Sequence, residues 1–203
     1  MMAILALAAA YLLGSIPFGY LLVKLFTGGD VRQSGSGNIG ATNVLRTTGR
    51  LAAIATLLLD IAKGVAAVWL AGWLTGGSEL WTSAAALAVM AGHAFPVFLR
   101  FRGGKAVATF IGAFLYLTPL PLAAVLVVFI ATVAWTRYIS LGSILAAGCF
   151  PLGVWLILHP ATPVILAALI AGVFIVYRHH ANIARLRAGT EHVFRWRGLP
   201  SSR

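Results

Sequence analysis

Residues 51–74 read LAAIATLLLDIAKGVAAVWLAGWL, and only Thr56, Asp60 and Lys63 in this stretch are polar. A helix that crosses a bilayer needs about 20 consecutive, mostly apolar residues. A strand of a membrane barrel would instead alternate apolar and polar residues with a period of two. The stretch is continuously apolar, so it predicts a transmembrane helix.

The rest of the chain repeats this pattern. Of its 203 residues, 61% are hydrophobic and 9% are charged, whereas soluble proteins carry about 25% charged residues. We therefore expect an all-α integral membrane protein that forms a single polytopic domain over residues 1–203. The net charge of +11 comes from basic residues scattered between the apolar runs. Because no separate basic domain with interleaved aromatic residues is present, we expect no nucleic-acid partner.

Seven spans account best for the distribution of charge. The predicted spans are residues 3–26, 51–74, 80–99, 107–118, 120–136, 141–158 and 164–177. One long helix over 107–136 would also fit, but it would move Arg137 and the later basic residues to the other side. With a proline-driven turn at 118–121, the basic loops share one side, which the positive-inside rule identifies as the cytoplasm. We expect the N-terminus outside and the C-terminus in the cytoplasm.

Four polar segments then meet at the cytoplasmic face. They are GSGNIGATNVLR at 35–46, GHAFPVFLRFRGGKAVAT at 92–109, RYISLGS at 137–143 and RHHANIARLRAGTE at 178–191. Since they lie on the same side of the bundle, they can form one site.

The first segment has the spacing of a glycine-rich anion loop. Gly35, Gly37 and Gly40 fit G-x-G-x-x-G, but no βαβ unit can surround them in a helical membrane protein. Backbone amides freed by glycine can still form an anion-binding nest. The side chains that would join them are Ser36, Asn38, Thr42, Asn43 and Arg46. A simple solvated loop is the alternative to a phosphate site.

The second segment places a cation after two glycines, Gly103-Gly104-Lys105. A flexible backbone followed by a point charge also suits phosphate. The alternative is that Arg100, Arg102 and Lys105 anchor the chain to anionic lipid headgroups.

Ionisable and polar residues also occur inside or at the ends of the spans. Asp60 and Lys63 are three residues apart and can pair, either to orient the bundle or to brace the site. His179 and Asn182 share a helix face, where His179 could accept a proton or hold a hydroxyl that Asn182 positions. His93 lies near the end of the third span. We expect no metal, because no cluster of Cys, His or carboxylate ligands is present.

Taken together, the four segments and DIAKG at 60–64 resemble the bacterial acyl-phosphate:glycerol-3-phosphate acyltransferase family, PlsY, over nearly the whole chain. The resemblance implies transfer of a fatty acyl group from acyl phosphate to the sn-1 hydroxyl of glycerol 3-phosphate. The products would be lysophosphatidic acid and phosphate, formed without a cofactor or metal at the cytoplasmic face of the bacterial inner membrane. Membrane lipids would surround the enzyme, and it would be functionally coupled to an enzyme that produces acyl phosphate.

The residue patterns and the resemblance together assign roles to residues, and the resemblance itself covers Ser36, Arg46, Gly103, Gly104, Lys105, Ser143, His179, Asn182 and Glu191. The expected catalytic residues are Ser36, Arg46, Lys105, His179 and Asn182. Gly35, Gly37, Asn38, Gly40, Thr42, Asn43, Gly103, Gly104 and Ser143 would bind substrate, and Asp60, Lys63, His93, Arg137 and Glu191 would support the site. One departure is Ala106, where the family commonly has glycine.

A transporter of a phosphorylated solute is the alternative function. It would need polar groups along a transmembrane path and often an inverted repeat, and no two halves of this sequence match. The proton acceptor stays open among Ser36, His179, Asn182 and the substrate phosphate, as do the preferred acyl chain length and the oligomeric state.

Overall fold

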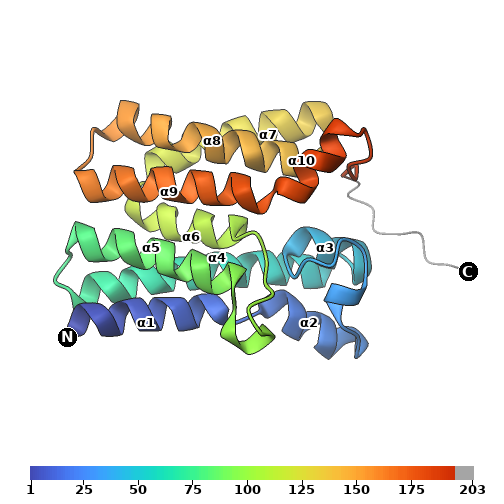
Figure 1. Ribbon diagram of the computed structural model, residues 1–203, viewed down its shortest axis with the longest axis horizontal. Coiled ribbons are helices and arrows are strands. Elements are labelled where there is room, and N and C mark those ends of the chain that lie inside the picture. Colours follow the sequence, from blue (N-terminus) through green and yellow to red (C-terminus); the bar gives the residue numbers. More distant parts are fainter. Residues whose placement is uncertain (195–203) are drawn as a thin grey trace, which may run out of the picture.

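The structure is a computed structural model that describes residues 1–194, and it contains helices and no strands within that range (Figure 1). The helices are α1 Met2–Ser15, α2 Phe18–Thr27, α3 Ala41–Thr47, α4 Arg50–Leu74, α5 Glu79–Ala94, α6 Val107–Leu117, α7 Pro119–Thr136, α8 Ile139–Leu158, α9 Thr162–Arg178 and α10 His180–Arg187. Two 3₁₀ turns, η1 Val31–Gln33 and η2 Val97–Leu99, precede α3 and α6. The predicted all-α class is therefore confirmed for the described residues.

The long helices form two groups (Figure 1). Helices α1, α4, α5 and α6 pack on one another, while α8 packs against both α7 and α9. Glycines allow close approach in the first group: a methyl group on Gly64 of α4 would overlap the carbonyl oxygen of Thr109 in α6, and one on Gly112 would overlap that of Ile61. In a bilayer, small residues let helix backbones pack this closely. As a result, the start of α6 lies directly against the middle of α4.

The chain reverses between the two groups at Thr118. Helix α6 ends at Leu117 and α7 begins at Pro119, whose missing N–H costs nothing in the first turn of a helix. The predicted break at 118–121 is confirmed. Because α6 packs on α4 while α7 packs on α8, this reversal also carries the chain from one group of helices to the other.

Five segments among the described residues are long and apolar enough to cross a membrane, with α1 and α2 taken as one segment. A sixth is the pair α9 and α10, which is bent by 54°. Helix α6 has only 11 residues, fewer than the roughly 20 of a straight span. The chain is thus a multi-pass membrane protein, while seven spans and the sides of the termini stay predictions. The C-terminal end lies outside the described residues.

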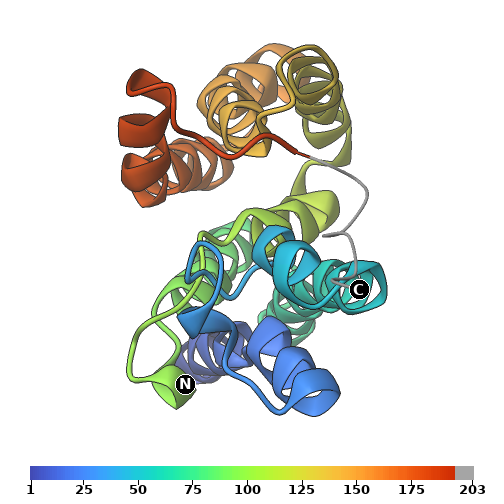
Figure 2. The same cartoon turned by 90° about the vertical axis from the view of Figure 1, so that its right-hand side faces the viewer.

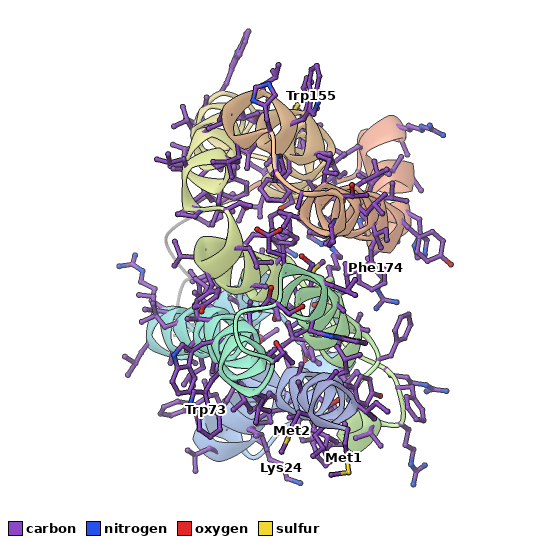
Figure 3. All side chains as sticks on the ribbon, turned by 90° about the vertical axis from the view of Figure 1, so that its left-hand side faces the viewer. Met1, Met2, Lys24, Trp73, Trp155 and Phe174 are labelled. Atoms are coloured by element: carbon purple, nitrogen blue, oxygen red, sulfur yellow. The ribbon has the colours of Figure 1, made fainter. Side chains whose placement is uncertain are left out.

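The two ends of the molecule differ in polarity. Met1 lies at one end, and α3, the loop before α6 and α10 lie at the other (Figures 1 and 2). Figure 3 looks onto the Met1 end, where Trp73 and Trp155 point outward at the rim. Exposed tryptophans of this kind are typical of a membrane interface. The four polar segments therefore share the end opposite Met1.

Candidate active site

A cavity of about 590 Å³ lies between α4 and α6 on one side and α7 and α8 on the other. All four polar segments line it: Ser36, Thr42 and Arg46 from the first, Lys105 from the second, Ser140 and Ser143 from the third, and His179, Asn182 and Glu191 from the fourth. The predicted convergence of these segments is confirmed. The rest of the lining is apolar and includes Leu57, Ile61, Phe110, Leu122, Val125 and Phe129. The cavity therefore has a polar part and an apolar part.

Asn43 holds the first glycine loop together. Its side chain is 1% exposed, its Oδ1 accepts from the amide of Ser36 at 2.8 Å, and its Nδ2 donates to the carbonyls of Val31, Ser34 and Asn38 at 2.9–3.1 Å. Gly35 adopts φ +61°, and a methyl group there would overlap the Asn43 Oδ1. The glycine is required for this fit, and Asn43 is committed to the loop itself.

The predicted nest of glycine amides needs correction. The amide of Gly37 donates to the carbonyl of Ser34 at 3.1 Å, and that of Gly40 donates to Asn38 Oδ1 at 2.8 Å. These donors are already used and cannot be offered to an anion without breaking the loop. The polar side chains that the first segment offers to the cavity include Ser36 from the loop and Arg46 from α3. Arg46 makes no hydrogen bond or ion pair with residues 1–194.

The glycine amides of the second loop likewise donate hydrogen bonds within the protein. The amide of Gly103 donates to the carbonyl of Ala94 at 3.2 Å, and that of Gly104 donates to the carbonyl of His93 at 3.0 Å. These carbonyls end α5 and would otherwise lack partners. Gly103 and Gly104 do not line the cavity, whereas Lys105 and Ala106 do, and Lys105 is the charged group that this loop presents.

A short polar network anchors Lys105. Its Nζ donates to Asn182 Oδ1, and Asn182 Nδ2 donates to Glu191 Oε1 at 2.8 Å. Glu191 also accepts from Ser140 Oγ at 3.1 Å and from Arg185 Nε at 2.8 Å. Because Asn182 is held at both ends of its amide, its oxygen must face the lysine. Glu191 thus orients Asn182, while its supporting role in the site stays a prediction.

The charges of this region favour anions. Arg46, Lys105, Arg178 and Arg185 act on one another electrostatically, and Glu191 is the carboxylate among them. Burial, together with the neighbouring arginines, lowers the pKa of Lys105 to about 8, although Glu191 acts to raise it. Burial opposes ionisation of Glu191, but hydrogen bonds from Asn182 and Arg185 outweigh it and keep its pKa below the ordinary value. The net positive charge suits a phosphate.

His179 lies at the break between α9 and α10. Its Nδ1 lies 2.8 Å from the carbonyl oxygen of Ile175, and a carbonyl can only accept, so Nδ1 carries the proton and Nε2 keeps a lone pair. Burial, together with the Lys105 cation, lowers the pKa of His179 to about 4. His179 is therefore a neutral imidazole at neutral pH.

A buried ion pair lies behind the second loop. Lys63 Nζ is 2.8 Å from Asp60 Oδ1 and donates to the carbonyl of Ile16 at 2.8 Å. His93 Nδ1 is 3.6 Å from the same carboxylate oxygen. Asp60 and His93 also line the cavity. The predicted pairing of Asp60 with Lys63 is confirmed, and His93 joins it.

Some expected residues lie elsewhere. Gly35 and Gly37 do not line the cavity, and neither does the exposed Arg137, whose carbonyl accepts from the amide of Phe194 at 2.7 Å. The site also contains Ser140, Arg178 and Arg185, which the sequence reasoning missed. A signal for the arginines was present: Arg178, Asn182 and Arg185 recur at spacings of four and three residues, the period of one helix face.

Ala106, the departure from the family pattern, adopts φ +61°. This left-handed region is where glycine is favoured. The alanine therefore keeps a backbone shape that glycine would adopt without strain.

Comparisons with known proteins point to one family. A family model described as glycerol-3-phosphate acyltransferase matches residues 4–189. The glycerol-3-phosphate acyltransferase of Trichlorobacter lovleyi is 53% identical over 189 residues, which cover 93% of this chain and 96% of the relative. That of Desulforamulus reducens is 47% identical over 188 residues, which cover 93% of each chain.

Two solved structures share the fold. Both are crystal structures of PlsY, described as an integral membrane glycerol 3-phosphate acyltransferase. Its glycerol 3-phosphate form is 38% identical with a TM-score of 0.91 and covers 96% of both chains. Its lysophosphatidic acid form is 37% identical with a TM-score of 0.88 and covers 97% of both chains. The family match, the similar relatives and the shared fold together show that the chain belongs to the glycerol-3-phosphate acyltransferase family.

Proposed function

We propose that this protein transfers a fatty acyl group from acyl phosphate to the sn-1 hydroxyl of glycerol 3-phosphate, which yields lysophosphatidic acid and inorganic phosphate. The observation that carries the proposal is the two-part cavity. Cations surround its polar part, and apolar side chains of α4, α6, α7 and α8 line the rest. Such a cavity suits substrates and a product that join a phosphate to a long hydrocarbon chain. Family membership favours this function over a transporter of a phosphorylated solute.

The chemistry is a direct acyl transfer. The glycerol hydroxyl oxygen attacks the acyl carbonyl carbon, the bond from that carbon to the phosphate oxygen breaks, and phosphate departs with the bonding electrons. Arg46 and Lys105 bind the phosphates and stabilise the negative charge that develops, a contribution of a few kcal/mol per well-placed donor. Acyl phosphate is already activated, so no acylated enzyme is required.

His179 and Asn182 orient the attacking hydroxyl. A general base works best when its pKa lies near the operating pH, and burial holds the pKa of His179 near 4. The departing phosphate is the stronger base, so it takes the hydroxyl proton while His179 accepts a hydrogen bond from the hydroxyl. Ser36, Asn38, Thr42 and Ser143 complete the polar lining.

The membrane setting follows from the polarity of the two ends. We place the polar end in the cytoplasm of a bacterium and the Met1 end outside, in one domain with seven spans, of which α6 and α7 are the fourth and fifth. Membrane-impermeant reporters on Met1 and Arg203 test this arrangement in intact cells. Labelling of both ends from the same side would contradict it.

The decisive experiment is turnover by the purified protein. Palmitoyl phosphate and radiolabelled glycerol 3-phosphate should yield lysophosphatidic acid, whereas palmitoyl-CoA in a parallel reaction should yield none. Product from acyl-CoA alone would overturn the proposed donor. Uptake of glycerol 3-phosphate into proteoliposomes without product would favour the transporter instead.

A further inference from the structure

Arg178, the last residue of α9, hydrogen-bonds to the backbone of the second glycine loop. Its Nε and Nη2 donate to the carbonyl of Gly104 at 3.2 and 2.8 Å, and Nη2 also reaches the carbonyl of Gly103 at 3.4 Å. Its guanidinium lies over the ring of Phe95, 5.0 Å from the centroid. Arginine suits this arrangement because its planar fork can contact two acceptors and stack on an aromatic face.

His93 holds the same loop from the side of α5. Its carbonyl accepts from the Gly104 amide, and a methyl group on Gly104 would overlap its Nε2. His93 is 4% exposed and lies next to the buried pair of Asp60 and Lys63. The imidazole is therefore closely packed and cannot easily move away from the loop. The loop backbone lies between His93 and Arg178.

Lys105 follows directly after this confined backbone. Its ammonium group is bound to Asn182, which is four residues after Arg178 and lies beyond the 54° bend at His179. The bent pair α9 and α10 thus contacts this segment twice, at the Gly103 and Gly104 carbonyls just before the lysine through Arg178, and at the lysine ammonium group through Asn182. The two contacts together define where the ammonium group lies.

We propose that Arg178 is a positioning residue. By hydrogen-bonding to the Gly103 and Gly104 carbonyls, it fixes the position of the Lys105 ammonium group. The assignment rests on the proposed function, in which Lys105 binds substrate phosphate. Arg178 acts through the loop, and its side chain is absent from the cavity lining. A displacement of about 1 Å in a binding group can lower turnover about 100-fold, so a loosened loop has a measurable effect.

Arg178→Lys separates this role from charge alone, because it keeps the cation and loses the fork. We expect the KM for glycerol 3-phosphate to rise and kcat/KM to fall by about 10- to 100-fold. Arg100→Lys is the matched control: Arg100 is an exposed arginine at the start of the same loop, and its substitution should leave both constants unchanged.

The pH profile adds a readout that a purely structural role would not move. Lys105 faces Glu191, Arg185, Arg46, Arg178 and His179, and it is partly buried. When the loop loosens, Lys105 gains water, and its alkaline titration should move upward by about one pH unit. Gly104→Ala, which pushes the loop from the side of His93, should give the same two changes.

The outcomes are distinct. Wild-type kinetics in Arg178→Lys would overturn the proposal, as would a lower kcat with unchanged KM and unchanged alkaline titration, because that result reports only a smaller folded fraction. Calorimetric binding of glycerol 3-phosphate to the same variants gives the affinity without turnover. Failure of the wild-type protein to form lysophosphatidic acid would instead remove the proposed function.

Discussion

The glycine loop at residues 34–40 is held by a residue close to it in the sequence, whereas the loop at residues 100–106 is held both by nearby carbonyls of α5 and by Arg178 from a distant helix. Asn43 makes the hydrogen bonds of the first loop across separations of 5 to 12 residues. Arg178 binds the second across separations of 74 and 75 residues. The first loop is therefore a local structure, while the second depends on the packing of α5 and α9. Two cations line the same cavity: Arg46 lies in α3, which follows the first loop, and Lys105 lies in the second loop.

Removal of the two cations tests whether the loops contribute equally. Arg46→Ala and Lys105→Ala should each lower kcat/KM about 100- to 1,000-fold, because each removes a donor that stabilises developing charge. His179→Ala should likewise nearly abolish turnover. Arg46→Ala should leave the thermal unfolding temperature unchanged, since Arg46 bonds to no described residue. Near-wild-type acylation by the purified Arg46 or His179 variant would refute the assigned role.

Asn43→Ala should disrupt the loop at residues 34–40 and leave the loop at residues 100–106 intact. The substitution leaves several buried amide and carbonyl groups without partners, so we expect the free energy of unfolding to fall by about 2–3 kcal/mol. Thermal unfolding in detergent measures the change. Asn38→Ala, which removes only the bond to the Gly40 amide, is the matched control and should cost less than half as much. Equal losses would show that Asn43 is not the main support.

The two cations should also differ in their response to pH. Burial lowers the pKa of Lys105 to about 8, so its charge is present below pH 8 and is lost as the pH rises through that value. Arginine stays protonated throughout this range. At pH 9 only about a tenth of Lys105 is protonated, and the KM for glycerol 3-phosphate should rise accordingly. In Lys105→Arg this alkaline change should disappear; its persistence would assign the titration to another group.

The smallest expected effect concerns strain in the second loop. Ala106 has φ +61°, a region that costs a non-glycine residue about 1–2 kcal/mol, while glycine adds about 0.5–1 kcal/mol of chain entropy to the unfolded state. Ala106→Gly should therefore stabilise the protein by less than about 1 kcal/mol in thermal unfolding. Ala108→Gly is the control: Ala108 lies within α6, where glycine should destabilise. Destabilisation by both would contradict the strain at Ala106.

Much of the arrangement could be predicted from the sequence. Continuous apolar runs indicate spans because the bilayer demands them, and the break at Thr118 follows from the prolines after it. Basic residues confined to alternate loops indicate that Arg46, Lys105 and His179 share one end. The Asp60 and Lys63 pair follows from helix periodicity. These features depend on local composition or on spacing within one helix.

The tertiary structure alone decided which polar groups are free. The sequence offered glycine amides as anion ligands, but at Gly37, Gly40, Gly103 and Gly104 the folded chain uses them internally. It also made Glu191 the acceptor for Ser140, Asn182 and Arg185. Each buried donor must find an acceptor, and which acceptor is nearest depends on how distant helices pack. Sequence thus determined the membrane helices and the polar end, while packing determined that side chains, rather than glycine amides, face the cavity.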